Sequence, residues 1–367
     1  MNAKRFAQAI TELPLRGRNS TDTLNRKGLI MRINMTEWSN EIIKAKDRRN
    51  LPVLFFPVIK NMEISVPEST QEADKQAEVM LEVINEYPET IAAITGMDLT
   101  VDSECFGATV KFSKRQAPNI KSIVIQDESE IKDLVIPGVD SGRQQMVLDA
   151  VKKCQNKLTD RPTFGGMLGP FSLAANLMEV SKALVLTGRN PDAMEMLLEK
   201  CTDFLINRAR AFKEAGANGI FIAEPTAGLL SPDALERFSS KYVKRLVEEV
   251  QDDYFFLILH NCGRVIDSID SMYNTGCKGF HFGNNVQMPE VLAKIPANVL
   301  VFGNIDPSSD FVMGTKEEIY EKTTKLLQDT SEFPHFVLSS GCDLAPMVED
   351  EKIEAYYQAC RDFNKSL

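Results

Sequence analysis

The sequence lacks any apolar run near the roughly 20 residues that a membrane-spanning helix requires, although 43% of its 367 residues are hydrophobic. Its first residues are polar and do not contain the apolar core of a signal peptide. With 26% charged residues, the composition is typical of a globular protein. We therefore expect a cytoplasmic protein with no membrane partner.

Positive charge is also scarce, since 42 Lys and Arg residues stand against 52 Asp and Glu residues and the formal net charge is −10. This excess of acid argues against nucleic acid or an anionic membrane as a partner. The seven cysteines, an odd number spread along the chain, do not suggest a disulfide framework, and reduced cytosolic thiols fit them better. Five are expected to be small structural residues: Cys105, Cys154, Cys201, Cys277 and Cys360.

The sequence has no low-complexity segment, no linker rich in Gly or Ser and no internal repeat. Short apolar runs instead alternate with longer segments of helical periodicity, which favours parallel α/β units. The helical segments are Glu72–Tyr87, Ala193–Glu214, Pro232–Gln251, Lys316–Asp329 and Glu349–Asn364. The eight predicted strands are Val53–Phe56, Leu99–Ser103, Thr163–Leu168, Gly219–Ala223, Phe255–Leu259, Gly279–Phe282, Val299–Phe302 and Phe336–Ser339.

Eight strands separated by helices predict a (β/α)₈ barrel of the TIM type, in the α/β class, formed by one domain over residues 1–367. Residues 1–50 are expected to form a partly helical extension before the barrel. Residues 104–135, whose apolar stretches are broken by Lys, Arg and Pro, are expected to form an inserted hairpin. The alternative is an open doubly wound sheet, and the number of strands favours the barrel.

The most informative motif is His260-x-Cys262, which follows the apolar run Phe255–Leu259 and precedes Gly263. Residues i and i+2 of a strand point to the same face, so the imidazole and the thiol converge. A second apolar strand ends just before Cys342. One His and two Cys at the carboxyl ends of barrel strands would form a catalytic zinc site with one open position. The His-x-Cys pair alone is also compatible with a buried polar pair that binds no metal.

This set of ligands is soft to borderline, which favours Zn²⁺ over Mg²⁺ or Ca²⁺. Two thiolates and one neutral imidazole leave the site without net positive charge, so it would activate water poorly. It suits an external thiol, which titrates near pH ~8.5 when free and is deprotonated on a metal. The resulting thiolate is a strong nucleophile at neutral pH.

Further residues follow the predicted strands and complete the candidate site. Glu224 is a candidate fourth ligand or a carboxylate that orients His260, and the alternative is a helix-start or surface residue. His281 could line the mouth of the barrel or lie in its core. Asp306 could touch substrate or fix a loop through backbone N–H groups. We assign catalytic roles to Glu224, His281 and Asp306, and contacts with a cofactor to Asn284, Asn304 and Met167.

Several segments resemble the uroporphyrinogen decarboxylase superfamily, from about residue 50 to the end of the chain. They are Gly169-Pro170-Phe171-Ser172-Leu173-Ala174, Ala215-Gly216-Ala217, Leu230-Ser231-Pro232 and Gly303-Asn304-Ile305-Asp306-Pro307. Within this resemblance, His260-Asn261-Cys262-Gly263 with Ser340-Gly341-Cys342 is similar to the zinc branch, the methylcobamide:coenzyme M methyltransferases and related corrinoid-dependent methyltransferases. The resemblance implies that His260, Cys262 and Cys342 bind zinc, which binds the acceptor thiol, and that Glu224 is a further zinc contact.

The sequence also departs from the superfamily at two places. The decarboxylases carry an arginine-rich segment near the first strand, whereas the stretch Leu51–Pro57 contains no arginine and none follows directly. This difference argues against decarboxylation of a porphyrinogen. The sixth strand often ends in an acid in the superfamily, but here it ends in Gly283-Asn284-Asn285, which leaves the identity of the acceptor open.

The sequence therefore predicts a zinc-dependent methyltransferase that moves a methyl group from a methylcobalamin-type corrinoid to a thiol such as coenzyme M. A separate corrinoid protein would carry the corrinoid as a bound substrate. One alternative is transfer in the other sense, from a methoxylated or methylamine-type donor to the corrinoid. A second is a metal-free, uroporphyrinogen decarboxylase-like lyase in which His260 and Cys262 are structural.

Overall fold

The computed structural model describes residues 32–114 and 116–367. Residues Arg32–Leu367 form one compact unit. Of the predicted extension over residues 1–50, the part up to residue 31 lies outside the described residues, and the rest includes a helix over Met35–Lys44. The assignment of the whole chain to a single domain stays a prediction.

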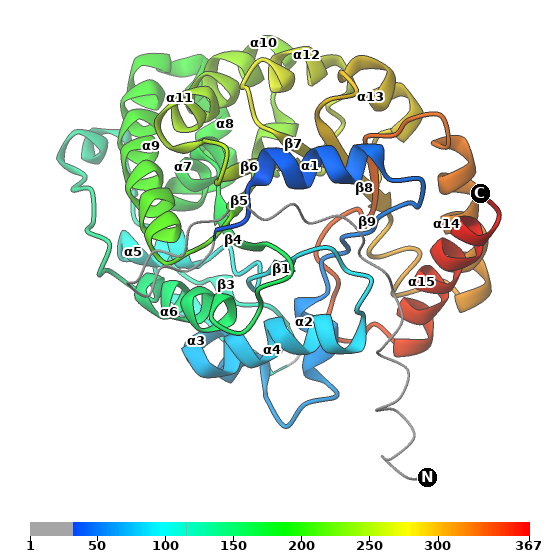
Figure 1. Ribbon diagram of the computed structural model, residues 1–367. Helices are drawn as coiled ribbons and strands as arrows, with labels where there is room; N and C mark the ends of the chain where they lie inside the picture. Colours follow the sequence, from blue (N-terminus) through cyan, green and yellow to red (C-terminus); the bar gives the residue numbers. More distant parts are fainter. Residues whose placement is uncertain (1–31, 115) are drawn as a thin grey trace, which may run out of the picture. The chain divides into compact units, whose positions relative to one another are not determined.

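Within the described residues, seven parallel strands form one sheet whose order follows the chain. They are β1 Ala93–Ile94, β4 Thr163–Leu168, β5 Gly219–Ala223, β6 Phe256–Asn261, β7 Gly279–Phe282, β8 Leu300–Ile305 and β9 Phe336–Ser340. Asn50 joins the two edges, because it forms isolated bridges with Thr90, before β1, and with Leu338 of β9. The Leu51 N–H also donates to the Leu338 carbonyl over 2.9 Å. The curled sheet and this seam confirm the predicted α/β barrel (Figure 1).

The first two predicted strands are wrong. Helix α2 (Phe55–Ile59) begins inside the predicted strand Val53–Phe56, and helix α5 (Val101–Cys105) occupies most of Leu99–Ser103. All five residues of α2 are buried, and a short, fully buried apolar run reads the same whether it is a helix or a strand. In place of the second predicted strand the barrel has the two-residue strand β1, which is too short to show the alternation of apolar and polar residues.

Side chains of the strands alternate between the barrel interior and the surrounding helices, as the two-residue period of a strand requires. The interior cluster contains Phe164, Phe221, Phe256, Ile258, Leu300, Phe302 and Val337. Residues at the intervening positions, such as Ile222 and Leu257, belong to the larger cluster that packs against the helices. This alternation determines which polar side chains reach the mouth of the barrel.

The helices surround the sheet (Figure 1). They are α1 Met35–Lys44, α2 Phe55–Ile59, α3 Val66–Gln71, α4 Ala73–Glu86, α5 Val101–Cys105, α6 Gln144–Gln155, α7 Pro170–Met178, α8 Val180–Arg189, α9 Pro191–Glu214, α10 Pro232–Leu235, α11 Lys241–Val250, α12 Ile269–Tyr273, α13 Met288–Lys294, α14 Lys316–Asp329 and α15 Asp350–Lys365. Shorter helical turns are η1 Glu128–Asp133, η2 Thr226–Leu229, η3 Glu236–Ser240 and η4 Ile266–Ser268.

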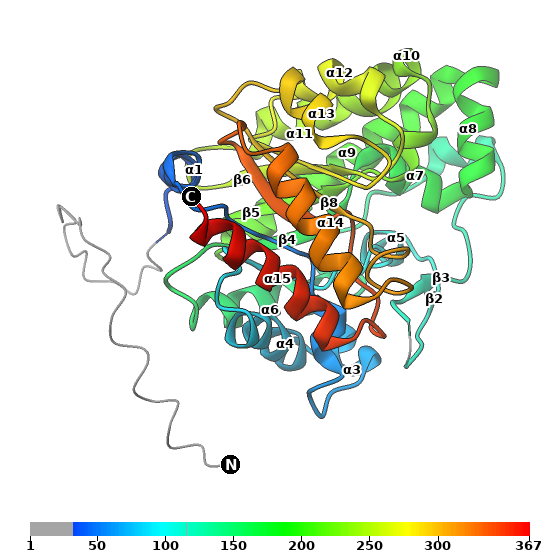
Figure 2. The ribbon, with the colours of Figure 1, turned by 90° about the vertical axis from the view of Figure 1, so that its right-hand side faces the viewer.

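The predicted helical segments are confirmed as α4, α9, α14 and α15, while Pro232–Gln251 is divided into α10, the π-helical turn η3 and α11. Helix α14 begins with a capping box, since the Thr315 hydroxyl accepts from the Glu318 N–H and the Glu318 carboxylate accepts from the Thr315 N–H. Helices α14 and α15 lie side by side on the outside of β8 and β9 (Figure 2).

Helix α1 covers the end of the barrel at which the strands begin. Trp38 packs against Phe164 at the start of β4, with ring centroids 6.0 Å apart. The Met35 N–H donates to the carbonyl of Asp253, just before β6, over 2.6 Å. In Figure 1 this helix crosses in front of the strands. The open mouth therefore lies at the opposite end, where the strands finish.

The predicted hairpin within residues 104–135 is present as the antiparallel strands β2 (Val110–Lys111) and β3 (Asn119–Ile120).

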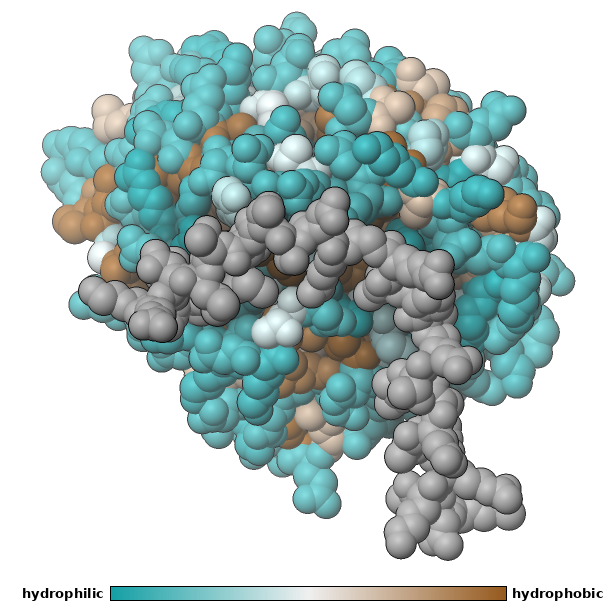
Figure 3. Space-filling model, viewed as in Figure 1, coloured by the Kyte–Doolittle hydropathy of each residue, from teal (hydrophilic) through white to brown (hydrophobic). Residues whose placement is uncertain are grey.

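The face seen in Figure 3 is mostly hydrophilic where it is described, with hydrophobic residues gathered in small patches. Among the helices of the described residues, none combines the length and the apolar character needed to cross a membrane.

Candidate functional site

A cavity of about 160 Å³ opens at the carboxyl ends of the strands. Its walls are mainly apolar, and its polar groups are imidazole, thiol and carboxyl groups. The lining residues are Val53, Met97, Leu99, Phe221, Ala223, Pro225, His260, Cys262, His281, Cys342 and Asp343. The described lining residues thus include no lysine or arginine. Burial raises the pKa of the lining residue Asp343 well above its ordinary value.

The cavity brings together the three predicted zinc ligands. His260 is the inward-facing residue near the end of β6, and Cys262 follows two residues later. Cys342 reaches the same point from the loop after β9, with its Sγ 3.7 Å from Nε2 of His260. Cys262 and Cys342 line the same cavity as His260. Sequence spacing therefore predicted correctly which side chains converge.

The distance between His260 Nε2 and Cys342 Sγ agrees with a shared zinc ion. With a Zn–S bond of about 2.3 Å, a Zn–N bond of about 2.0–2.1 Å and tetrahedral angles, a nitrogen and a sulfur ligand lie ~3.6 Å apart. Across the described residues, no set of three or more His, Cys, Asp or Glu side chains is assembled as a complete metal-binding group. The donor types and this distance nevertheless fit zinc, and Cys262 lines the same cavity.

The two thiols do not share the same acidity. The hydrogen bond from Cys342, followed by that with His260, holds the pKa of Cys262 well below its ordinary value. The same pairing with Cys262, together with burial, holds the pKa of Cys342 well above it. The lowered pKa of Cys262 favours its thiolate, which is the form that binds a soft metal.

His281 lies beneath this cluster and contacts it directly. Its Nδ1 is 2.7 Å from Nδ1 of His260, its register partner on the neighbouring strand. Its Nε2 is 2.9 Å from the Ser339 hydroxyl oxygen. The imidazole is packed edge-on against the ring of Phe221 at 5.8 Å between centroids. Burial, and then repulsion from His260, hold the pKa of His281 well below its ordinary value.

Glu224, the expected fourth ligand, does not lie with these donors and its assignment is corrected. Because Phe221 and Ala223 face the cavity, Glu224 points the other way, toward the helices. Its Oε1 accepts from the Phe171 N–H over 3.0 Å, and its Oε2 accepts from the Ser172 N–H and hydroxyl over 2.9 and 2.7 Å. It therefore caps the start of α7. Burial raises the pKa of Glu224 to about 7, against the lowering effect of these bonds.

We predict that Glu224→Gln destabilises the fold without changing zinc affinity. Both carboxyl oxygens accept bonds from N–H or O–H donors, so the amide group of Gln must face one of those donors. A buried donor left unpaired costs about 1–3 kcal/mol, and denaturant unfolding measures the loss. Zinc titration against a chelator provides the second measurement. Weaker zinc binding at unchanged stability would instead return Glu224 to the ligand set.

The remaining predicted site residues lie outside the cavity lining. Met167 is buried among core residues on the helix side of β4, so its assignment to a cofactor contact is wrong. It is the neighbouring Gly166 that faces the interior, where an added Cβ would meet the sulfur of Met97. The prediction overlooked that only alternate residues of β4 face inward.

The three polar residues after β7 and β8 brace loops at the rim. The Asn304 amide donates to the carbonyls of Gly283 and Val286 over 3.0 and 2.9 Å. Asp306 accepts from the backbone N–H groups of two following serines over 2.7 and 2.9 Å, which agrees with the loop-fixing alternative for this residue. The Asn284 amide donates to Asp306 over 2.6 Å. Contact of these residues with a substrate stays a prediction.

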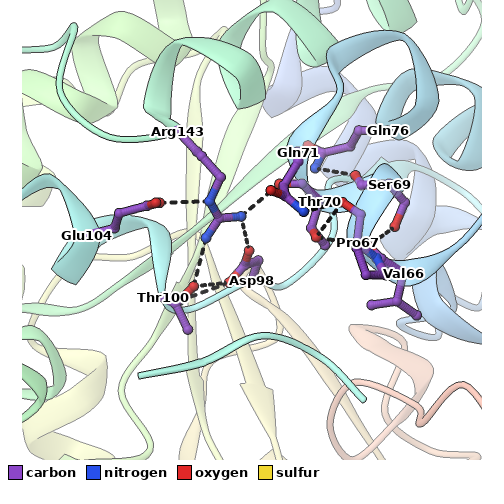
Figure 4. A network of polar contacts seen from close by, with 10 residues as sticks. All are labelled: Val66, Pro67, Ser69, Thr70, Gln71, Gln76, Asp98, Thr100, Glu104 and Arg143. Atoms are coloured by element: carbon purple, nitrogen blue, oxygen red, sulfur yellow. Dashed lines mark hydrogen bonds and ion pairs between the residues drawn. The ribbon is translucent and has the colours of Figure 1, made fainter. Parts of the chain in front are cut away.

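Arg143 holds the loop that supplies Met97 and Leu99 to the cavity wall. Its guanidinium forms ion pairs with Asp98 at 2.5 Å and Glu104 at 2.7 Å, and it donates to the Thr100 hydroxyl over 2.9 Å. Figure 4 shows these groups converging on Arg143 from the loop after β1 and from α5. Sequence reasoning missed this network, because Arg143 is 39 residues or more from each partner.

Ser339 was also missed as a site residue, although the sequence contained a signal for it. Two adjacent serines, Ser339 and Ser340, end an otherwise apolar strand, and both are fully buried. Buried hydroxyl groups require hydrogen-bond partners. The inward-facing one of the two is therefore expected to bond to a polar group inside the barrel.

Comparison with known proteins gives a consistent set of relatives. The family model described as uroporphyrinogen decarboxylase (URO-D) matches residues 58–363. A methylcobamide:CoM methyltransferase, MtbA of Methanosarcina acetivorans, is 26% identical over 349 residues, covering 90% of this chain and 99% of the relative. A uroporphyrinogen decarboxylase of Pseudoalteromonas translucida is 25% identical, covering 80% of this chain and 84% of the relative.

The solved structure of a methyltransferase from Methanosarcina mazei superposes with a TM-score of 0.80 at 24% identity. The superposition covers 90% of this chain and 99% of the chain from Methanosarcina mazei. This agreement shows a shared fold. The residues matched by the uroporphyrinogen decarboxylase family model include all three predicted zinc ligands.

Proposed function

This chain belongs to the uroporphyrinogen decarboxylase family, and from that premise we propose that it is a zinc-dependent methyltransferase acting between a corrinoid and a thiol. The observation that carries the proposal is the convergence of His260, Cys262 and Cys342 in one apolar cavity at the barrel mouth. The relatives named as methylcobamide:CoM methyltransferases support it, since they cover up to 90% of the chain.

Zinc held by these three residues would supply Lewis acidity that lowers the pKa of an acceptor thiol at its open position. The residues of the chain do the rest. Val53, Leu99 and Phe221 exclude water from the acceptor sulfur, which strengthens it as a nucleophile. The thiol proton leaves to solvent. The sulfur forms a new bond to the methyl carbon as the Co–C bond breaks, and cobalt keeps the electron pair as Co(I).

The corrinoid would be presented over the mouth by a separate corrinoid protein. Two observations bear on the chemical identity of the acceptor. The names of the relatives point to coenzyme M, whereas the described lining of the cavity in this chain includes no lysine or arginine. An anionic acceptor would therefore find no cationic partner in the wall. We propose a small thiol as the acceptor class, with coenzyme M as one member to be tested.

The experiment is a methyl-transfer assay with purified protein, methylcobalamin and a panel of thiols, with zinc content measured on the same sample. We expect about one zinc per chain and thiol-dependent formation of cob(I)alamin. Absence of zinc together with decarboxylation of uroporphyrinogen would support the lyase alternative. Methylation of cob(I)alamin by methoxylated or methylamine-type donors, with no thiol active, would reverse the direction of transfer.

A further inference from the structure

Resting on the proposed methyl transfer to a thiol, we infer that Asp343 recognises the acceptor, and that the acceptor is a small thiol whose other end carries an N–H or O–H donor. Thiols that end in an amine or a hydroxyl group belong to this class. Thiols that end in a sulfonate do not. Asp343 is thus a specificity residue, separate from the three proposed zinc ligands.

Asp343 lies where an acceptor would place its second polar group. It follows Cys342 directly in the loop after β9, and both residues line the cavity. The Cα atoms of consecutive residues are about 3.8 Å apart across a trans peptide. A thiol whose sulfur is at the proposed zinc centre can therefore reach Asp343 through a short carbon chain.

The carboxyl group of Asp343 has an unused acceptor. Its Oδ1 is buried and has no hydrogen-bond partner among the described groups. Buried polar atoms usually have a partner, and leaving one without a partner costs free energy. A carboxyl group keeps acceptor capacity with or without a proton. The missing partner is therefore an N–H or O–H group, which a ligand in the cavity can supply.

The other polar residue of the described lining, outside the proposed zinc ligands, is already engaged. This residue is His281. Its Nδ1 lies 2.7 Å from Nδ1 of His260, and its Nε2 lies 2.9 Å from the Ser339 hydroxyl oxygen. Both ring nitrogens thus have a partner within the protein. Among the described lining residues, Asp343 is left as the group that can bind the far end of an acceptor.

The rest of the wall disfavours an acceptor that ends in an anion. Val53, Leu99 and Phe221 are apolar, and the described lining includes no lysine or arginine. A sulfonate has acceptors only, so it would face the Asp343 oxygen with no donor between them and no cation to balance its charge. An unpaired polar group is costly in apolar surroundings.

The size of the cavity favours a short acceptor. Its volume is about 160 Å³, and an apolar cavity of ~150 Å³ holds a molecule the size of benzene. The acceptor would share this space with the proposed zinc ion. Short aliphatic thiols fit these limits, and their far end would lie beside Asp343.

The test uses four thiols of one skeleton that differ at the end away from sulfur: 2-aminoethanethiol, 2-mercaptoethanol, ethanethiol and 2-mercaptoethanesulfonate, which is coenzyme M. Calorimetry measures the binding of each thiol to zinc-loaded protein, and kcat/KM for methyl transfer from methylcobalamin is measured on the same samples. We expect the amine and the alcohol to bind about 10–100-fold more tightly than the sulfonate, the effect of one buried polar group that gains or lacks its partner.

Variants separate the role of Asp343 from differences among the thiols themselves, such as their acidity. Asp343→Leu removes the acceptor oxygen, and we expect it to lose the preference for the amine and the alcohol over ethanethiol. Asp343→Asn keeps an acceptor oxygen and adds a donor, so it should retain binding of the alcohol and bind the sulfonate more tightly. Glu349→Gln is the matched control, since Glu349 is a 62% exposed carboxylate on the same loop that pairs with Lys352. Zinc content is expected to be equal in all of them.

The inference and the proposed function can fail separately. Methyl transfer to coenzyme M at least as efficient as to the amine and the alcohol retains the proposed function and overturns the role of Asp343, and so does an unchanged order of thiols in Asp343→Leu. Binding of the amine and the alcohol that depends on Asp343, with no methyl transfer to any thiol, rejects the proposed function and retains the recognition. If no thiol binds, both are overturned. If Asp343→Leu does not fold, the wild-type series and Asp343→Asn still decide.

Discussion

Replacing Cys342 with serine is expected to remove zinc from the protein and to abolish methyl transfer. Structural zinc sites bind with roughly 10–16 kcal/mol shared among four ligands, or about 2.5–4 kcal/mol for each. Loss of one thiolate therefore weakens binding on the order of 10²–10³-fold. Serine has nearly the same shape as cysteine, but its hydroxyl stays protonated at neutral pH and is a poor ligand for zinc.

The variant also separates the metal role from a structural one. Cys105→Ser is the control, because Cys105 is a buried cysteine whose thiol donates to the Ser141 carbonyl, apart from the cavity lining. We expect the control to keep its zinc content, and Cys342→Ser to lose zinc while keeping a cooperative unfolding transition. Full zinc content and full methyl transfer in Cys342→Ser would reject the proposed centre.

The second large effect is expected in stability, from the ion pair of Asp102 and Arg208. Both side chains are 1% exposed, and Arg208 Nε lies 2.8 Å from Asp102 Oδ1. The other carboxylate oxygen accepts from the Leu168 N–H at the end of β4 over 2.8 Å. Burial raises the pKa of Asp102, and Arg208 is the main group that opposes this rise.

Arg208→Met leaves the Asp102 carboxylate buried without its partner, which costs about 3–5 kcal/mol. That is a large part of the 5–15 kcal/mol by which a typical native protein is stable. Urea unfolding measures the change. Arg210→Met is the matched control two residues along α9, where Arg210 pairs with Glu249 at the surface and less than about 1 kcal/mol is expected.

A double variant shows the origin of this cost. Replacing both partners, as in Arg208→Met with Asp102→Asn, removes the isolated charge and should recover a large part of the lost stability. If Arg208→Met changes stability no more than Arg210→Met does, the buried pair contributes little to holding α5 against α9.

The sequence predicted the later strands of the barrel well and the first two poorly. Strands β4 to β9 are apolar runs bounded by helical periodicity, so their existence could be inferred from pattern alone. The segment near Asn50 that closes the barrel shows no strand pattern in its sequence. Its backbone hydrogen bonds are to β9 and to residues before β1. Contacts between residues so far apart in sequence leave no local signal.

The candidate site shows the same division. The convergence of His260 and Cys262 follows from the two-residue period of one strand. The orientation of Glu224 could have been read in the same way from Ala223, whereas the sequence argument considered only its place after the strand. The contact between His260 and His281 depends on the register of two strands, which no spacing within a single strand reveals.

The seam at Asn50 has a consequence for the order of events during synthesis. Ser339 and Leu51, which bond across it, are 288 residues apart in the chain. At about 5–20 residues per second, the first side of the seam waits roughly 15–60 s for the other to be made. The barrel therefore closes only after Ser339 has been made, and Cys342 emerges later still. The proposed metal centre is completed only after Cys342 emerges, so Cys262, made 80 residues earlier, stays without that partner for roughly 4–16 s.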